Sequence, residues 1–107
     1  MTPDEVRQLI LGLVAKQIQG PDAHFNAEVK AEEAENVAAT AFDVAFMSAE
    51  GNIEERKAQA RLQTEEQRSA AFIARAEHNR VKLKIQQINN SLVAYQAVLK
   101  SMLQDGA

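Results

Sequence analysis

The last quarter of the chain carries a long apolar repeat, and this repeat points to a helical fold. Between residues 81 and 102, large apolar side chains recur at alternating spacings of four and three residues. They are Val81, Ile85, Ile88, Leu92, Tyr95, Leu99 and Met102. Steps of three and four place side chains along one stripe of an α-helix, as at the a and d positions of a heptad. The repeat therefore predicts a helix that packs lengthwise against a partner.

The same rhythm extends over a much longer stretch and has a counterpart earlier in the chain. Traced backward, it passes through small and polar residues: His78, Ala74, Ala71, Gln67, Thr64, Ala60, Lys57 and Ile53. A second series has the same spacings: His24, Ala27, Ala31, Ala34, Ala38, Ala41, Ala45 and Ser48. Alanine against alanine permits close helix approach. We expect these two seams to face each other in a long antiparallel helical hairpin, a coiled coil closed at Gly51-Asn52.

Start and stop signals divide the chain into three predicted helices. Thr2-Pro3-Asp4-Glu5 and Asn52 with Glu55 are helix starts with capping boxes, and Gly20-Pro21 and Gly51 are stops. The predicted helices are 3–19, 22–50 and 53–104. At 107 residues the chain is one domain, and the fold class is all-α, a helical hairpin with an extra N-terminal helix.

Charged residues that flank the seams suggest a register for the hairpin. A tight loop at Gly51-Asn52 pairs residues whose numbers sum to roughly 103. This places Arg75 opposite Glu28 and Arg68 opposite Glu35, the kind of flanking pair that sets coiled-coil orientation.

The apolar surface exceeds what one hairpin can cover. Helix 3–19 should fold back on the C-terminal seam through Val6, Leu9, Ile10, Leu13, Val14 and Ile18. The remaining large apolar residues point away from the seams: Leu11, Phe25, Val29, Val37, Val44, Met47, Phe72 and Ile73. Apolar surface on both sides of a hairpin favours a further partner, so these residues form a predicted oligomer or partner interface. The oligomer number stays open, as does a domain swap of the first helix at Gly20-Pro21.

The sequence offers little for catalysis. It has no cysteine, phosphate-binding glycine loop or nucleophile motif. His24 and His78 fall near each other in the proposed register, with Asp22, Glu28 and Glu77 nearby, but no E-x-x-H or H-E-x-x-H motif is present. We predict no enzymatic activity, no metal and no cofactor. Without a signal peptide or a membrane-length apolar run, we expect a soluble cytoplasmic protein that binds no membrane.

Two charged surfaces are candidate partner contacts. Arg80, Lys82 and Lys84 could meet nucleic acid or an acidic partner, although a net charge of −3 and few aromatic residues disfavour direct nucleic-acid binding. The acidic set Glu32, Glu33 and Glu35 could meet a basic partner, but a solvated, salt-bridged face is its commoner role.

The stretch Ala49–Ala60, AEGNIEERKAQA, resembles a turn in small helical proteins of tailed bacteriophages and prophages, A-E-G-x-x-E-E-R-K-A-x-A. The resemblance covers roughly residues 28–103 and carries no functional residue. Such proteins are often encoded near recombination or replication genes. The resemblance therefore implies a phage accessory protein of DNA metabolism. Together with the uncovered apolar surface, it leads us to expect an oligomeric accessory or adaptor protein that binds a protein partner in DNA recombination or replication. The alternatives are a phage inhibitor that sequesters a host defence or nuclease protein, and a structural coiled-coil spacer.

Overall fold

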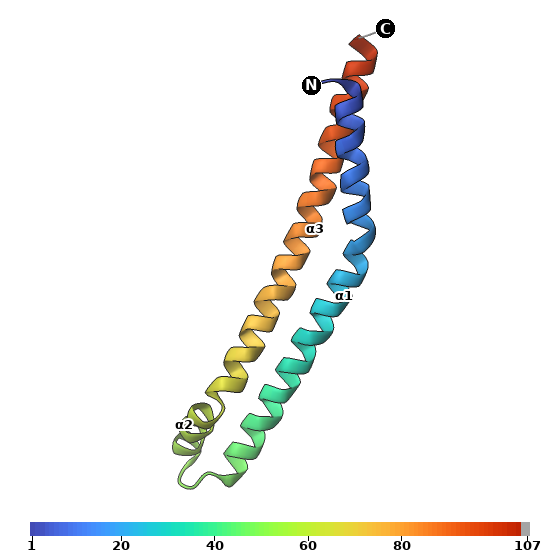
Figure 1. Ribbon diagram of the computed structural model, residues 1–107. Coiled ribbons are helices and arrows are strands. Elements are labelled where there is room, and N and C mark those ends of the chain that lie inside the picture. Colours follow the sequence, from blue (N-terminus) through green and yellow to red (C-terminus); the bar gives the residue numbers. More distant parts are fainter. Residues whose placement is uncertain (106–107) are drawn as a thin grey trace. The chain divides into compact units, whose positions relative to one another are not determined.

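The computed structural model describes residues 1–105, and three helices account for nearly all of them. They are α1 (Pro3–Ser48), α2 (Ile53–Gln63) and α3 (Glu65–Asp105). No strand occurs in this part of the chain. The predicted all-α class, with three helices and a helical hairpin, is confirmed (Figure 1). The helix boundaries differ from the predicted ones at two places.

The contacts group into two compact units, each built from separate parts of the chain. Unit 1 joins Met1–His24 to the chain from Arg80 onward, and unit 2 is Phe25–Asn79. In unit 1, the first half of α1 lies antiparallel to the C-terminal half of α3 (Figure 1). Unit 2 contains the second half of α1, the turn after Ser48, α2 and the start of α3. The expectation of one domain stays a prediction.

The predicted stop at Gly20-Pro21 is wrong, because α1 continues through both residues. Pro21 has no N–H and so removes one helical hydrogen bond to Gln17. Gly20 does not take the left-handed conformation of a helix end, and within the described chain only Gly51 has a positive φ. Gly20 is buried against Ile85, and Gln17 Nε2 donates a hydrogen bond to Asn89 Oδ1 at 3.0 Å. We infer that packing on α3 outweighs the local stop signal.

The predicted turn at Gly51-Asn52 is confirmed. Gly51 has φ 111°, which is readily accessible to glycine. Asn52 caps α2: its Oδ1 accepts from the Glu55 N–H at 2.9 Å, and its Nδ2 donates to Glu55 Oε1 at 2.9 Å. Across the turn, the Arg56 guanidinium lies 4.3 Å from the centre of the Phe46 ring and donates two hydrogen bonds to the Phe46 carbonyl. These contacts hold the end of α1 to the start of α2.

The predicted helix 53–104 is interrupted at Thr64, so a single helix there is wrong. Thr64 is buried, and both its N–H and its Oγ1 donate to the Ala60 carbonyl, at 3.1 and 2.7 Å. A hydroxyl that bonds four residues back competes with the helical ladder and can bend it. The Arg61 carbonyl accepts from Arg68 Nη2 at 3.0 Å. The ladder resumes with the Arg68 N–H on the Thr64 carbonyl.

The predicted seams of α2–α3 and of the second half of α1 are buried or half-buried, apart from Ile53 and Ser48 at the turn. The predicted face of the first helix is partly wrong. Ile18 is 73% exposed and Leu9 is also exposed, whereas Val6 is fully buried. Because α1 is continuous, the face that carries the alanine seam also determines which residues of its first half face α3. Ile18 does not lie on that face.

The core consists mostly of alanine. Six of the eight buried hydrophobic residues in the described chain are alanines, and the other two are Val6 and Leu92. The chain exposes 7785 Å², against roughly 5,900 Å² for a folded monomer of this mass. Most large apolar side chains therefore contribute little to burial within one copy.

Candidate functional site

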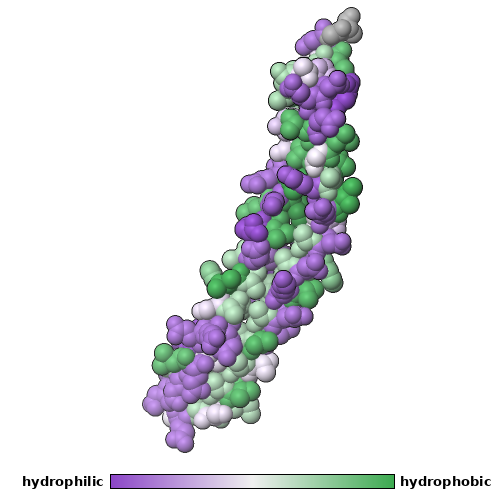
Figure 2. Space-filling model, in the orientation of Figure 1, coloured by the Kyte–Doolittle hydropathy of each residue, from purple (hydrophilic) through white to green (hydrophobic). Residues whose placement is uncertain are grey.

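The apolar residues predicted to bind a partner are largely exposed. Leu11 in unit 1 is exposed, as are six of the seven predicted residues of unit 2; Val29 is half-buried. Phe72 and Ile73 stand next to each other on α3, 76% and 67% exposed. Figure 2 shows apolar patches among polar side chains on the face in view. The structure thus places these residues where a partner could reach them, while their binding role stays a prediction.

Phe72 and Ile73 line a shallow hollow on the surface of unit 2. Its volume is about 450 Å³, and its other lining residues are Glu65, Arg68 and Ser69. All five belong to the first turns of α3, just after the interruption at Thr64. The hollow combines an apolar floor with one acid and one base at its edge, which suits a side chain from another protein.

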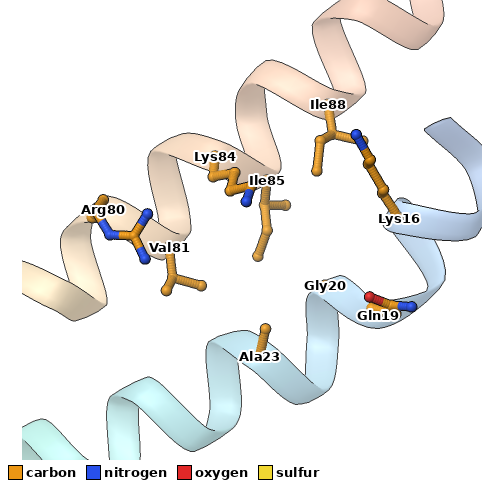
Figure 3. A pocket seen from close by; sticks show the side chains of 9 residues that line it. All are labelled: Lys16, Gln19, Gly20, Ala23, Arg80, Val81, Lys84, Ile85 and Ile88. Carbon is orange, nitrogen blue, oxygen red and sulfur yellow. The ribbon is translucent and has the colours of Figure 1, made fainter.

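Unit 1 contains a pocket of about 360 Å³ between α1 and α3 (Figure 3). Val81, Ile85 and Ile88 point from α3 toward α1, where Ala23 faces them (Figure 3). The remaining lining residues are Lys16, Gln19, Gly20, Arg80 and Lys84. The pocket therefore has an apolar wall and three basic side chains.

The pocket forms because small residues on α1 lie opposite the large apolar side chains of the α3 seam. Gly20 has no side chain, and a Cβ there would lie 3.4 Å from Ile85 Cγ1. Ala23 presents only a methyl group. Large residues on one helix and small residues on the other leave the basic side chains at the rim beside uncovered apolar carbon.

Two of the three predicted basic contacts line this pocket. Arg80 and Lys84 lie on its α3 side, four residues apart and thus on one helix face, whereas Lys82 is exposed outside it. Sequence reasoning missed Lys16, which approaches from α1 (Figure 3). With a helix end predicted at Gly20-Pro21, the sequence did not determine which face of the first helix carries Lys16, and so did not place it beside Lys84.

The acidic set is divided by an ion pair within unit 2. Arg75 donates two hydrogen bonds to the Glu35 carboxylate, one of them from Nε to Oε2 at 3.1 Å. The hydrogen bond from Arg75 lowers the pKa of Glu35, and the same bond raises the pKa of Arg75. Arg75 Nη1 also lies 3.1 Å from Nδ1 of the buried His78. Glu32 and Glu33 are exposed.

The predicted flanking pairs are therefore wrong by about one heptad. Arg75 hydrogen-bonds Glu35 rather than Glu28, although the charges of Glu32 and, to a smaller extent, Glu28 also contribute to the raised pKa of Arg75. Side chains on a helix lean toward its N-terminus, and in an antiparallel pair this direction leads to higher numbers on the partner. Arg68 leans the same way and bonds the Arg61 carbonyl instead of Glu35.

The comparisons with known proteins add no relative. No protein-family model, curated protein or solved structure matches the chain. None of the described helices is long and apolar enough to cross a membrane. His24 is half-buried in unit 1 and His78 is buried in unit 2; the absence of a metal, a cofactor and an enzymatic activity stays a prediction.

Proposed function

We propose that this protein is a non-enzymatic, oligomeric helical adaptor that binds other chains through apolar surface. The observation that carries the proposal is the distribution of apolar side chains. Alanines dominate the buried seam, while large residues such as Phe72 and Met47 are more than three-quarters exposed. Burying a phenylalanine or methionine contributes about 1.5–3 kcal/mol, so a partner gains most where these residues lie.

The biological setting of the proposal is a tailed phage, where the adaptor would hold a protein partner in DNA recombination or replication. This part rests on the resemblance of Ala49–Ala60 to phage proteins. The alternative of an inhibitor that presents Glu32, Glu33 and Glu35 to a basic partner has less support, because Arg75 already occupies the Glu35 carboxylate. Exposed Glu32 and Glu33 alone would carry that role.

The test is the mass of the protein in solution, measured by light scattering after size exclusion. We expect the wild type to be a dimer or larger, and Phe72→Asn with Ile73→Asn to shift it toward monomer while circular dichroism stays helical. Leu62→Asn is the matched control, because Leu62 is 75% exposed but outside the predicted interface. A wild type that stays monomeric at high concentration would refute the oligomer.

The setting is tested separately on the same fractions. A mobility shift with single-stranded DNA at low and high salt, for wild type and for Arg80, Lys82 and Lys84 replaced by alanine, measures direct nucleic-acid binding. Salt-sensitive binding that the triple variant loses favours the DNA role. If no binding is seen at either salt concentration, this protein does not contact DNA directly, and any DNA contact belongs to its protein partner.

A further inference from the structure

The two units carry opposite net charge. Unit 1 has six basic and four acidic side chains, whereas unit 2 has six basic and eleven acidic ones. The net charge of the whole chain is −3, so two copies repel each other on average. Any electrostatic attraction between copies must come from local contacts between a basic part of one and an acidic part of the other.

We infer that the basic pocket of unit 1 receives the acidic face of α1 from unit 2 of a second copy. The inference rests on the proposed self-association and names its contacts. On the basic side, Lys16, Arg80 and Lys84 line a pocket whose wall is Val81, Ile85 and Ile88. Neither Lys16 nor Lys84 forms an ion pair with any other described residue.

The acidic side is a face of α1 that begins at Phe25. Phe25, Val29 and Glu32 are spaced by four and three residues, and Glu33 lies four beyond Val29, so all four belong to one side of the helix. Phe25 is 63% exposed, and Glu32 and Glu33 are exposed without an ion pair among the described residues. This face therefore offers an apolar part followed by two carboxylates.

The two surfaces match in chemistry. An aromatic side chain fits a pocket with an apolar wall, and carboxylates fit its lysine rim, where partial burial strengthens each pair relative to open water. Each copy has one pocket and one acidic face, so the contact can be made twice, once in each direction. Such reciprocal contacts close as a symmetric dimer and leave neither surface unused.

Charge reversal tests the pairing. One variant carries Lys16→Glu and Lys84→Glu in the pocket, and a second carries Glu32→Lys and Glu33→Lys on the acidic face. Like charges then meet in both contacts of either homodimer, and we expect its dissociation constant to rise at least about tenfold. Mixing the two variants restores opposite charges in both contacts, so the mixture should form a heterodimer. Sedimentation velocity measures all three samples.

Two controls make the result specific. Lys82→Glu with Lys100→Glu changes the net charge by the same amount outside the pocket, and its dissociation constant should stay close to that of the wild type. Raising the salt from about 0.05 M to about 0.5 M should weaken the wild-type dimer, because exposed charge pairs are screened. Circular dichroism confirms that each variant remains helical.

The outcomes separate this inference from the adaptor proposal. If the wild type oligomerises and Phe72 and Ile73 govern it, but both charge variants keep the wild-type dissociation constant, the pocket contact is refuted and the adaptor proposal stands. Two weakened variants that fail to form a heterodimer also refute the contact. A wild type that is monomeric at all concentrations refutes both proposals together.

Discussion

Replacing Gly20 with alanine should stabilise the protein, even though Gly20 is buried between two helices. The residue lies inside α1 and does not have a positive φ. Inside a helix, alanine is favoured over glycine by about 0.8–1 kcal/mol. The new Cβ would lie 3.4 Å from Ile85 Cγ1, an ordinary van der Waals contact that costs little. Pro21 follows directly, and its Cδ crowds the Cβ of a preceding helical residue, so part of this preference is lost. We expect a gain of at most about 0.5 kcal/mol in the free energy of unfolding.

Two other glycines calibrate the measurement. At Gly12 a Cβ would meet nothing within 4 Å, so Gly12→Ala should report the helical preference alone, about 1 kcal/mol. At Gly51, φ is 111° and the Cβ would press on the Glu55 side chain, so Gly51→Ala should cost about 1–2 kcal/mol. Urea unfolding followed by circular dichroism, at one fixed protein concentration, gives all three values.

The sign of the Gly20→Ala result decides between two structures of this segment. If Gly20-Pro21 ended the helix, Gly20 would take the left-handed conformation and alanine would destabilise it, as at Gly51. A loss at Gly20 as large as the loss at Gly51, with a gain at Gly12, would therefore refute the continuous α1. A gain at both positions agrees with it.

Substitutions at three further positions test contacts of unit 2. Glu35→Gln should remove a contribution to folding stability that acid weakens. The hydrogen bond from Arg75 lowers the pKa of Glu35 in the folded protein. The stability that the Glu35 carboxylate provides is therefore fully present above its unfolded pKa of about 4.3, and it is lost as the pH falls through the folded pKa. The variant should therefore lose less stability than the wild type between neutral and acid pH in urea titrations. Arg56→Ala should cost about 2 kcal/mol, because it removes the cation–π contact and two hydrogen bonds to Phe46, and Arg56→Lys should recover only part of this loss in the same titration. Ala31→Leu should cost about 1–3 kcal/mol by overpacking, since Ala31 is fully buried in the seam; a thermal melt that matches the wild type would contradict close helix approach there.

The sequence predicted the buried seams well because periodicity reports burial directly. Alternating steps of three and four can align with a partner helix on only one face, so Ala27, Ala31 and Leu92 were identified without knowledge of the helix ends. The cap at Asn52 was also predictable, because its hydrogen bonds involve only neighbours in sequence. The repeated seams and the cap at Asn52 were therefore accessible from the sequence.

The errors have two different causes, one tertiary and one local. At Gly20-Pro21 the local stop signal was strong, but packing against α3 keeps the helix continuous. At Thr64 nothing in the heptad pattern marks an interruption, because the cause is a hydroxyl that bonds the Ala60 carbonyl. The basic pocket was missed because the helix was predicted to end at Gly20-Pro21. Only a continuous α1 fixes the helix face on which Lys16 lies, and so places Lys16 at the same pocket as Lys84.

The alanine seam links folding to association. A buried alanine methyl contributes about 0.8 kcal/mol, whereas a fully buried large side chain contributes about 1.5–3 kcal/mol. Six of the eight buried hydrophobic residues of the described chain are alanines, and Phe25, Met47 and Phe72 are exposed. One copy alone therefore leaves unused the apolar groups that could stabilise it most. If a second copy covers them, the midpoint of thermal unfolding should rise with protein concentration, because a partner that binds only the folded chain stabilises it by mass action. A midpoint that does not change over a wide concentration range would show that the alanine seam suffices, and would remove the physical reason for a second copy.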